Sequence, residues 1–166
     1  MTGLRPVAEL MYVDFVALAM DQIANQAAKI RYMFGGQMAV PMVLRTQGGT
    51  GRSAGAQHSQ SLEAWIMHTP GLRLAMPATV TDAHSLLRDA IRCEDPVIFL
   101  EPKHLYRQTY NKGPYPGPDY MIPFGKARHV ARGDDLTLIT YGALVHRSTQ
   151  ALRALEKRRD VSVDLI

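Results

Sequence analysis

The sequence is short of cysteine, with Cys93 as the single thiol in 166 residues. One thiol excludes an internal disulfide and a multi-cysteine zinc site, and it is typical of a reducing compartment. No apolar run approaches the ~18 residues that a membrane-spanning helix needs. The opening residues, MTGLRPVAEL, also lack the apolar core of a signal peptide. We therefore expect a cytoplasmic protein.

Several chemical signatures are also missing. The sequence has no G-x-S-x-G motif, and Cys93 precedes Glu94 and Asp95, whose charge disfavours a thiolate. The six histidines stand at no metal-ligand spacing. The net charge is only +4, and no basic stripe alternates with aromatic residues, so we expect no nucleic-acid partner. What remains is the ordinary composition of a folded protein, with 46% hydrophobic and 20% charged residues.

Apolar periodicity predicts strands that alternate with helices. We expect strands over 5–12, 39–46, 72–76 and 96–100, the second of them buried on both faces, and helices over 13–34, 61–68 and 79–92. Thr79 and Asp82 occupy the capping positions of the last helix. This alternation predicts an α/β fold, a mostly parallel sheet with helices on both faces.

The composition changes after residue 105. A segment rich in proline and tyrosine covers 106–134 and predicts a linker. A strand over 135–141, a helix over 143–159 and a strand over 161–166 then predict the start of a second α/β domain. The second unit stops within its sheet, and the first begins without a preceding βα unit. We therefore expect a fragment: residues 1–105 as a domain without its first βα unit, the linker, and a truncated second domain over 135–166.

A glycine-rich stretch follows the second expected strand, over 47–65: QGGTGRSAGAQHSQSLEAW. Its G-x-G-x-x-x-G pattern is one residue longer than the dinucleotide fingerprint, and the next expected helix starts several residues later. A phosphate cradle is therefore the weaker interpretation, and a loop whose backbone passes close to a ligand or partner is the stronger. His58 lies at the end of the sheet where α/β folds bind ligands, so it is a candidate for proton transfer. The alternative is a loop histidine hydrogen-bonded to Gln57 or Gln60.

Four stretches together are specific where each alone is not: DQIANQAAKIRYMFGGQ (21–37), VPMVLRTQGGTGRSAGAQHSQSLEAW (40–65), PGLRLAMPAT (70–79) and AIRCEDPVIFLEPKHLYR (90–107). They resemble the β-type subunit of the thiamine-diphosphate-dependent first (E1) component of 2-oxo acid dehydrogenase complexes. Pyruvate, branched-chain 2-oxo acid (2-oxoisovalerate) and acetoin dehydrogenases share the pattern, as does the central region of transketolase-like proteins. The resemblance covers essentially the whole chain.

The resemblance implies a transketolase-like pyrimidine-binding domain over 1–105 and roles for individual residues. Phe15, which by position alone is either core or a platform for a flat ring, matches the aromatic that packs on the cofactor's pyrimidine ring. His58 matches the histidine that faces the reactive carbon and assists acyl transfer to lipoyl-lysine. Thiamine diphosphate would be shared with an α-type chain that holds magnesium. Some family members bind a structural potassium ion through backbone carbonyls, at positions that match Met42, Ala90, Cys93 and Asp95.

The resemblance also implies partners: the α-type chain, a second β-type chain, the lipoyl-bearing E2 component and a small 2-oxo acid. Two family features are absent. The glutamate that activates the cofactor lies upstream of the segment beginning at Gly3, and Glu9 does not replace it. The diphosphate-binding signature is also missing, as is normal for a β-type chain. We therefore expect the fragment alone to be inactive.

Two matters stay open from the sequence. The chain could instead be a non-catalytic interaction module, because Ala24, Ala27 and Ala28 would let the long helix approach a partner chain closely; these alanines could equally pack inside the domain. Substrate cues conflict, since EPKHLYR favours branched-chain enzymes whereas YMFGGQ and AGAQHSQSLEAW favour pyruvate or acetoin enzymes.

Overall fold

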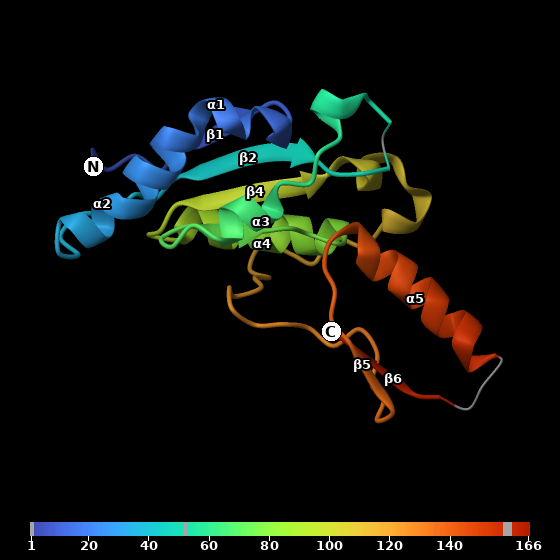
Figure 1. Cartoon of the computed structure of the whole chain (residues 1–166). Coiled ribbons are helices and arrows are strands. Elements are labelled where there is room, and N and C mark those ends of the chain that lie inside the picture. The colour runs from blue at the N-terminus through green and yellow to red at the C-terminus, as the bar shows by residue number, and fades with distance from the viewer. Residues whose placement is uncertain (1, 52, 158–160) are drawn as a thin grey trace.

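A four-stranded parallel sheet organises the first two thirds of the chain (Figure 1). The computed structural model describes residues 2–51, 53–157 and 161–166. The strands are β1 (Val7–Leu10), β2 (Val43–Gly48), β3 (Arg73–Ala75) and β4 (Val97–Pro102). Their order is β1-β2-β4-β3, and every neighbouring pair is parallel. The predicted parallel α/β fold is confirmed.

Both faces of the sheet are covered by helices, as the sequence predicted. Successive side chains of β4 point to opposite faces of the sheet. The first four residues of this strand, 97–100, are all buried. Ile98 and Leu100 pack with the long N-terminal helical segment and with α3 (Glu63–Met67). Val97 and Phe99 pack with α4 (Val80–Arg92) on the other face. A continuous apolar strand therefore supplies the core on both sides.

The expected long helix is one helical segment of mixed geometry. It begins with a 3₁₀ turn (Val13–Phe15), continues through α1 (Val16–Met20) and a π-helical stretch (Asp21–Ala27), and ends as α2 (Ala28–Met33). Ala28 N donates to Ile23 O across five residues, the spacing of a π turn. Residues five apart then share a face, which explains why Ile23 and Ala28 are both buried.

Two other local predictions had different outcomes. The capping box of α4 is confirmed: Asp82 N donates to Thr79 Oγ1 at 3.1 Å, and Thr79 N donates to the Asp82 carboxylate at 3.0 Å. The prediction of a strand over 39–46 that is buried on both faces was wrong in the bounds of the strand and in the burial of two of its residues. It runs over Val43–Gly48, and Leu44 and Arg45 are only partly buried. Pro41 lacks an N–H for the ladder, which accounts for the late start.

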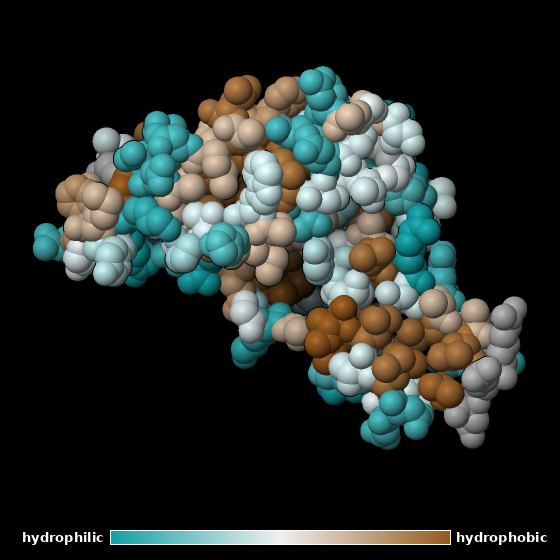
Figure 2. Space-filling view, viewed as in Figure 1, coloured by the Kyte–Doolittle hydropathy of each residue, from teal (hydrophilic) through white to brown (hydrophobic). Residues whose placement is uncertain are grey.

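The C-terminal part forms a small separate βαβ arrangement. β5 (Leu136–Leu138) and β6 (Val163–Leu165) are parallel, and α5 (Ala143–Glu156) connects them. Residues 158–160, where the sequence predicted the helix end and the following link, lie outside the described residues. Leu152, Val163 and Leu165 form the core of this unit. Figure 2 shows hydrophobic surface gathered over this C-terminal unit.

Two short 3₁₀ turns, Lys103–Arg107 and Thr109–Asn111, follow β4. Among the described residues between these turns and β5, none lies in a strand or an α-helix. No helix of the described residues is long and apolar enough to cross a membrane.

Candidate active site

The carboxyl ends of three neighbouring strands bring the candidate residues to one edge of the sheet. Leu10 of β1 pairs with Thr46 of β2, which pairs with Leu100 of β4. The segment around Phe15, the glycine-rich loop and the segment beginning at Lys103 therefore leave the sheet side by side (Figure 1). This is the edge where parallel α/β sheets bind ligands.

Close packing fixes the base of the glycine-rich loop. A Cβ on Gly48 would lie 2.3 Å from Val13 Cγ1, so only glycine lets the loop start against the first helical turn. Gly49 N donates to Gln60 O at 2.9 Å and closes the loop. The α-helix after the loop begins only at Glu63, and within the described part of the loop only a three-residue 3₁₀ turn (Ala56–His58) comes before it. This geometry favours the predicted close-packing role over a phosphate cradle.

His58 ends a 3₁₀ turn (Ala56–His58) and is half-buried. Its imidazole meets two aromatic rings edge-on: the centroid distance is 4.8 Å to Tyr12 and 5.5 Å to Phe15. Within the described part of the chain, the ring makes no hydrogen bond to the side chain of Gln57 or Gln60. The structure thus brings together the two residues that the sequence singled out, although they are 43 positions apart.

Asp14 ties the helical turn to the loop. Its side chain is 9% exposed, and Oδ1 accepts a hydrogen bond from Gln60 N at 3.1 Å. The other oxygen, Oδ2, is buried without a hydrogen-bond partner among the described residues. Sequence reasoning missed Asp14. Its place between the two aromatics of the YVDF string was the available signal.

Tyr12 and Lys103 were also missed. Lys103 Nζ lies 4.5 Å from the centroid of the Tyr12 ring and 3.4 Å from its hydroxyl oxygen. Lys103 directly follows β4, so the rule that ligands gather at the carboxyl ends of strands could have found it. Nothing in the sequence foretells that Tyr12 adopts a φ of 69°.

A hydrogen-bonded cluster lies near this edge on the α4 face. Arg45 donates to both oxygens of Glu101, at 2.8 and 3.1 Å, and the Tyr106 hydroxyl donates to Glu101 Oε2. Burial and the hydrogen bond to Glu101 raise the pKa of Tyr106 well above its ordinary value. The hydrogen bond to Glu101 also raises the pKa of Arg45. The phenol of Tyr106 therefore stays protonated to a more alkaline pH than an ordinary tyrosine does.

The four residues of the expected potassium site lie near the opposite edge of the sheet, around the starts of β2 and β4 and the end of α4. Met42 O accepts from Val97 N at 2.9 Å, and Ala90 O accepts from Cys93 N at 3.2 Å. Cys93 O accepts from Arg5 Nη1 at 3.0 Å. In the described ranges, no group of three or more His, Cys, Asp or Glu residues is placed to hold a metal ion. Potassium binding through carbonyls stays a prediction.

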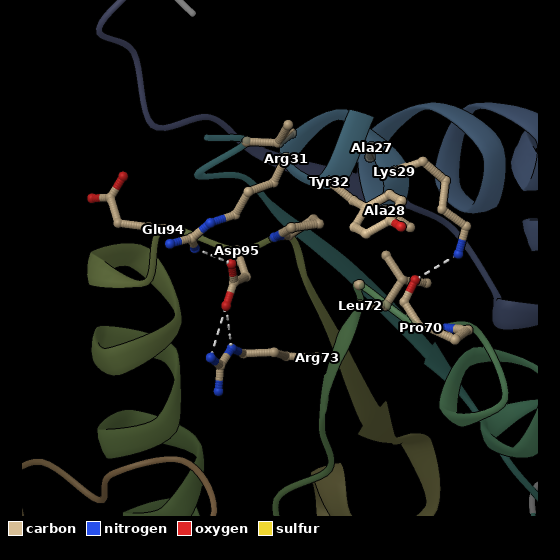
Figure 3. A pocket seen from close by; sticks show the side chains of 13 residues that line it. Ala27, Ala28, Lys29, Arg31, Tyr32, Pro70, Leu72, Arg73, Glu94 and Asp95 are labelled. Carbon is tan, nitrogen blue, oxygen red and sulfur yellow. Dashed lines mark hydrogen bonds and ion pairs between the residues drawn. The ribbon is translucent and has the colours of Figure 1, made fainter. Parts of the chain in front are cut away.

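Asp95 lines a cavity of about 810 Å³ at this edge, together with Arg31 and Arg73 (Figure 3). Its carboxylate accepts from Arg73 Nη2 at 2.7 Å and from Arg31 Nη1 at 2.5 Å. Burial opposes ionisation of Asp95, but the hydrogen bonds from Arg73 and Arg31 outweigh it and lower the pKa of the carboxyl. The hydrogen bond to Asp95 in turn raises the pKa of Arg73. The carboxylate of Asp95 is therefore engaged in ion pairs with Arg31 and Arg73.

Comparison with known proteins identifies the family of this chain. Residues 1–109 match the model "Transketolase, pyrimidine binding domain". The β subunit of an acetoin:2,6-dichlorophenolindophenol oxidoreductase from Cupriavidus necator is 49% identical over 155 residues, 93% of this chain and 45% of that protein. The 2-oxoisovalerate dehydrogenase subunit beta of Bacillus subtilis is 46% identical over 95% of this chain and 47% of that protein. The chain thus spans about half the length of these relatives.

Two further matches agree. The pyruvate dehydrogenase E1 component subunit beta of Rhizobium meliloti is 44% identical over the whole chain and 35% of that protein. A solved structure described as "Split gene transketolase, inactive beta4 tetramer" superposes with a TM-score of 0.74 at 18% identity, over 98% of this chain and 48% of that one. The chain therefore belongs to the transketolase pyrimidine-binding domain family, in the group that contains the β subunits of pyruvate, 2-oxoisovalerate and acetoin dehydrogenases.

Proposed function

We propose that this chain supplies the pyrimidine side of a thiamine-diphosphate site in a β-type E1 subunit. The parent reaction is oxidative decarboxylation of a 2-oxo acid, or acetoin cleavage, with transfer of the acyl group to lipoyl-lysine. The observation that carries the proposal is the meeting of His58 and Phe15, edge to face at 5.5 Å, at the carboxyl edge of the sheet. The relatives named above support it.

The residues present fit a flat heteroaromatic cofactor. Phe15 is 36% exposed and contacts His58 edge-on, which leaves ring surface for stacking against a second ring. Thiamine diphosphate, when bound, supplies an electron sink for the carbanion left by decarboxylation. Phe15 would orient its pyrimidine ring, and His58 would donate or accept a proton at an imidazole nitrogen.

The rest of the site would come from partners. In this proposal an α-type chain holds magnesium and the diphosphate group, a second β-type chain completes the assembly, and a lipoyl-bearing E2 component accepts the acyl group. The protein would work in the cytoplasm. A potassium ion at the carbonyls of Met42, Ala90, Cys93 and Asp95 would share Cys93 O with the Arg5 guanidinium, which donates to this oxygen at 3.0 Å.

The experiment is reconstitution of a β-type E1 subunit that contains this sequence and the activating glutamate with an α-type chain, thiamine diphosphate, magnesium and a panel of 2-oxo acids and acetoin. We expect acyl transfer to a lipoyl domain from the mixture and none from this chain alone. His58→Ala should lower the rate by about 10²-fold or more, because a positioned acid–base group contributes that much, while assembly is retained. Turnover by the chain alone, or full activity of His58→Ala, would contradict the proposal.

A second candidate function is assembly without chemistry. Leu18, Tyr32 and Met33 of the long helical segment are each more than two thirds exposed, at 86%, 89% and 71%. One structural relative is described as an inactive β4 tetramer. Of the small residues that favoured this reading, Ala28 packs inside the chain: a Cβ on Gly71 would lie 2.0 Å from its carbonyl oxygen. Stable oligomers with no effect of His58→Ala on any activity would favour this candidate.

A further inference from the structure

We propose that Tyr12, held by Lys103, is a positioning residue that fixes the orientation of the His58 imidazole. The inference rests on the proposed function, in which His58 is the acid–base group. Neither residue belongs to the set that the sequence comparison suggested. They come from different strands at the same sheet edge: Tyr12 follows β1 and contacts His58, whereas Lys103 follows β4 and contacts Tyr12.

The backbone at Tyr12 is the first observation. Its φ of 69° and ψ of 130° place an L-residue on the left-handed side of the map, where only glycine is unstrained. Such outliers persist where the surroundings hold them, and they gather at functional sites. Here Val13 is fully buried and the Asp14 carboxylate binds Gln60 N, so the two following residues hold the turn. The result is a phenol ring directed at His58.

The second observation is what holds the phenol. The Lys103 ammonium lies over the Tyr12 ring, 4.5 Å from its centroid, and Nζ is 3.4 Å from the hydroxyl oxygen. A cation over an aromatic face is attracted by the ring quadrupole, and the attraction grows with desolvation. Leu105, two residues on, is buried and anchors this segment. One face of the Tyr12 ring is thus clamped, and its edge relation to His58 is fixed.

The third observation is that His58 needs such support. Its loop is tied by backbone bonds at Gly49–Gln60 and Gly55–His58, but the described contacts of the imidazole itself are with Tyr12 and Phe15. Phe15 is the ring that the proposed function assigns to the cofactor. Tyr12, the closer of the two at 4.8 Å, is then the contact that stays constant through turnover. Proton transfer is steeply sensitive to such orientation.

NMR relaxation of the 166-residue chain tests directly whether Tyr12 and Lys103 restrict the motion of His58. We expect Tyr12→Leu to lower the backbone order parameter of His58 from about 0.85 to below about 0.6, with a matching gain in imidazole ring motion. Tyr12→Phe keeps the ring but loses the hydroxyl, and Lys103→Met loses the cation; both should give a smaller loss. Lys103→Arg keeps a cation at this position and should retain the wild-type order parameter of His58.

The matched control is Tyr115→Leu. Tyr115 meets His84 edge-on at 5.0 Å and 83°, close to the 4.8 Å and 83° of the Tyr12–His58 pair, but its partner is a histidine of α4 rather than His58. This variant should leave His58 unchanged. The inference is overturned if Tyr12→Leu alters His58 no more than Tyr115→Leu does, or if Lys103→Met leaves His58 as ordered as wild type.

A second readout separates this inference from the proposed function. In the assembled enzyme, Tyr12→Leu should lower kcat about tenfold or more with little change in KM. If His58→Ala retains full activity, the proposed function fails while the relaxation result still decides whether Tyr12 orders His58. If His58→Ala is inactive and Tyr12→Leu has wild-type kcat and relaxation, the positioning role alone fails.

Discussion

Gly48 is the residue on which the geometry of the site depends most directly. It ends β2 and begins the glycine-rich loop, and its backbone lies against Val13, the residue before Asp14. A Cβ here would meet Val13 Cγ1 at 2.3 Å and Val13 Cβ at 3.1 Å. Val13 is fully buried and cannot move outward. Gly48→Ala must therefore shift the first helical turn or the loop.

The size of the effect follows from two opposing contributions. Overpacking a tight core costs about 1–3 kcal/mol. Replacing glycine by alanine also reduces the entropy of the unfolded chain, which stabilises by about 0.4–1 kcal/mol. Packing should win because the Cβ–Cγ1 distance is far below van der Waals contact. We expect a net loss of about 1–2 kcal/mol, a Tm lower by about 2–8 °C in a chain of this size.

Denaturant unfolding of a double-mutant cycle measures this contact. Val13→Ala removes the clashing methyl, so Gly48→Ala should cost less in that background, with a coupling energy of about 0.5–3 kcal/mol. Gly113→Ala is the control, because the nearest atoms to its Cβ would lie at 3.3 and 3.4 Å, farther away than the 2.3 Å that separates Val13 Cγ1 from a Cβ on Gly48. An unchanged midpoint for Gly48→Ala, or strict additivity with Val13→Ala, would refute the packing argument.

Three other predictions concern local interactions. The lowered pKa of Asp95 contributes stability above its unfolded pKa of about 4, and this is lost as pH falls through the lowered value; Asp95→Asn should flatten the acid limb of the stability curve. An acid limb equal to that of wild type would argue against the Arg73 ion pair. Tyr106 should ionise last of the tyrosines in an alkaline absorbance titration, and Glu101→Gln should bring it back toward the others. Thr79→Ala should cost about 1 kcal/mol in urea unfolding through the lost helix cap, and a negligible cost would count against the capping box.

The sequence predicted the layered α/β fold because its signals are local. The continuous apolar run of β4, the capping residues of α4 and the glycines after β2 each act within a few residues. The π-helical stretch was missed because it depends on which residues meet the sheet: Ile23 and Ala28 are both buried there. Tertiary packing of this kind leaves no reliable mark on helical periodicity.

The candidate site was predictable only in part. The resemblance suggested His58 and Phe15, and the edge rule for parallel sheets placed the loop correctly. Tyr12 escaped because its role depends on a φ of 69° that no residue pattern announces. Lys103 escaped because its partner lies 91 positions away in the chain. Contacts between strand ends are set by sheet order, which the sequence does not encode locally.

Calorimetric titration of thiamine diphosphate into the assembly with an α-type chain tests the central claim most directly. The claim is that Phe15 and His58 face one cofactor, the first as a stacking surface and the second as an acid–base group. We predict that Phe15→Ala weakens binding about three- to tenfold, the worth of an aromatic contact, whereas His58→Ala binds nearly as wild type but fails to transfer the acyl group. Wild-type affinity in Phe15→Ala together with normal acyl transfer in His58→Ala would contradict the account.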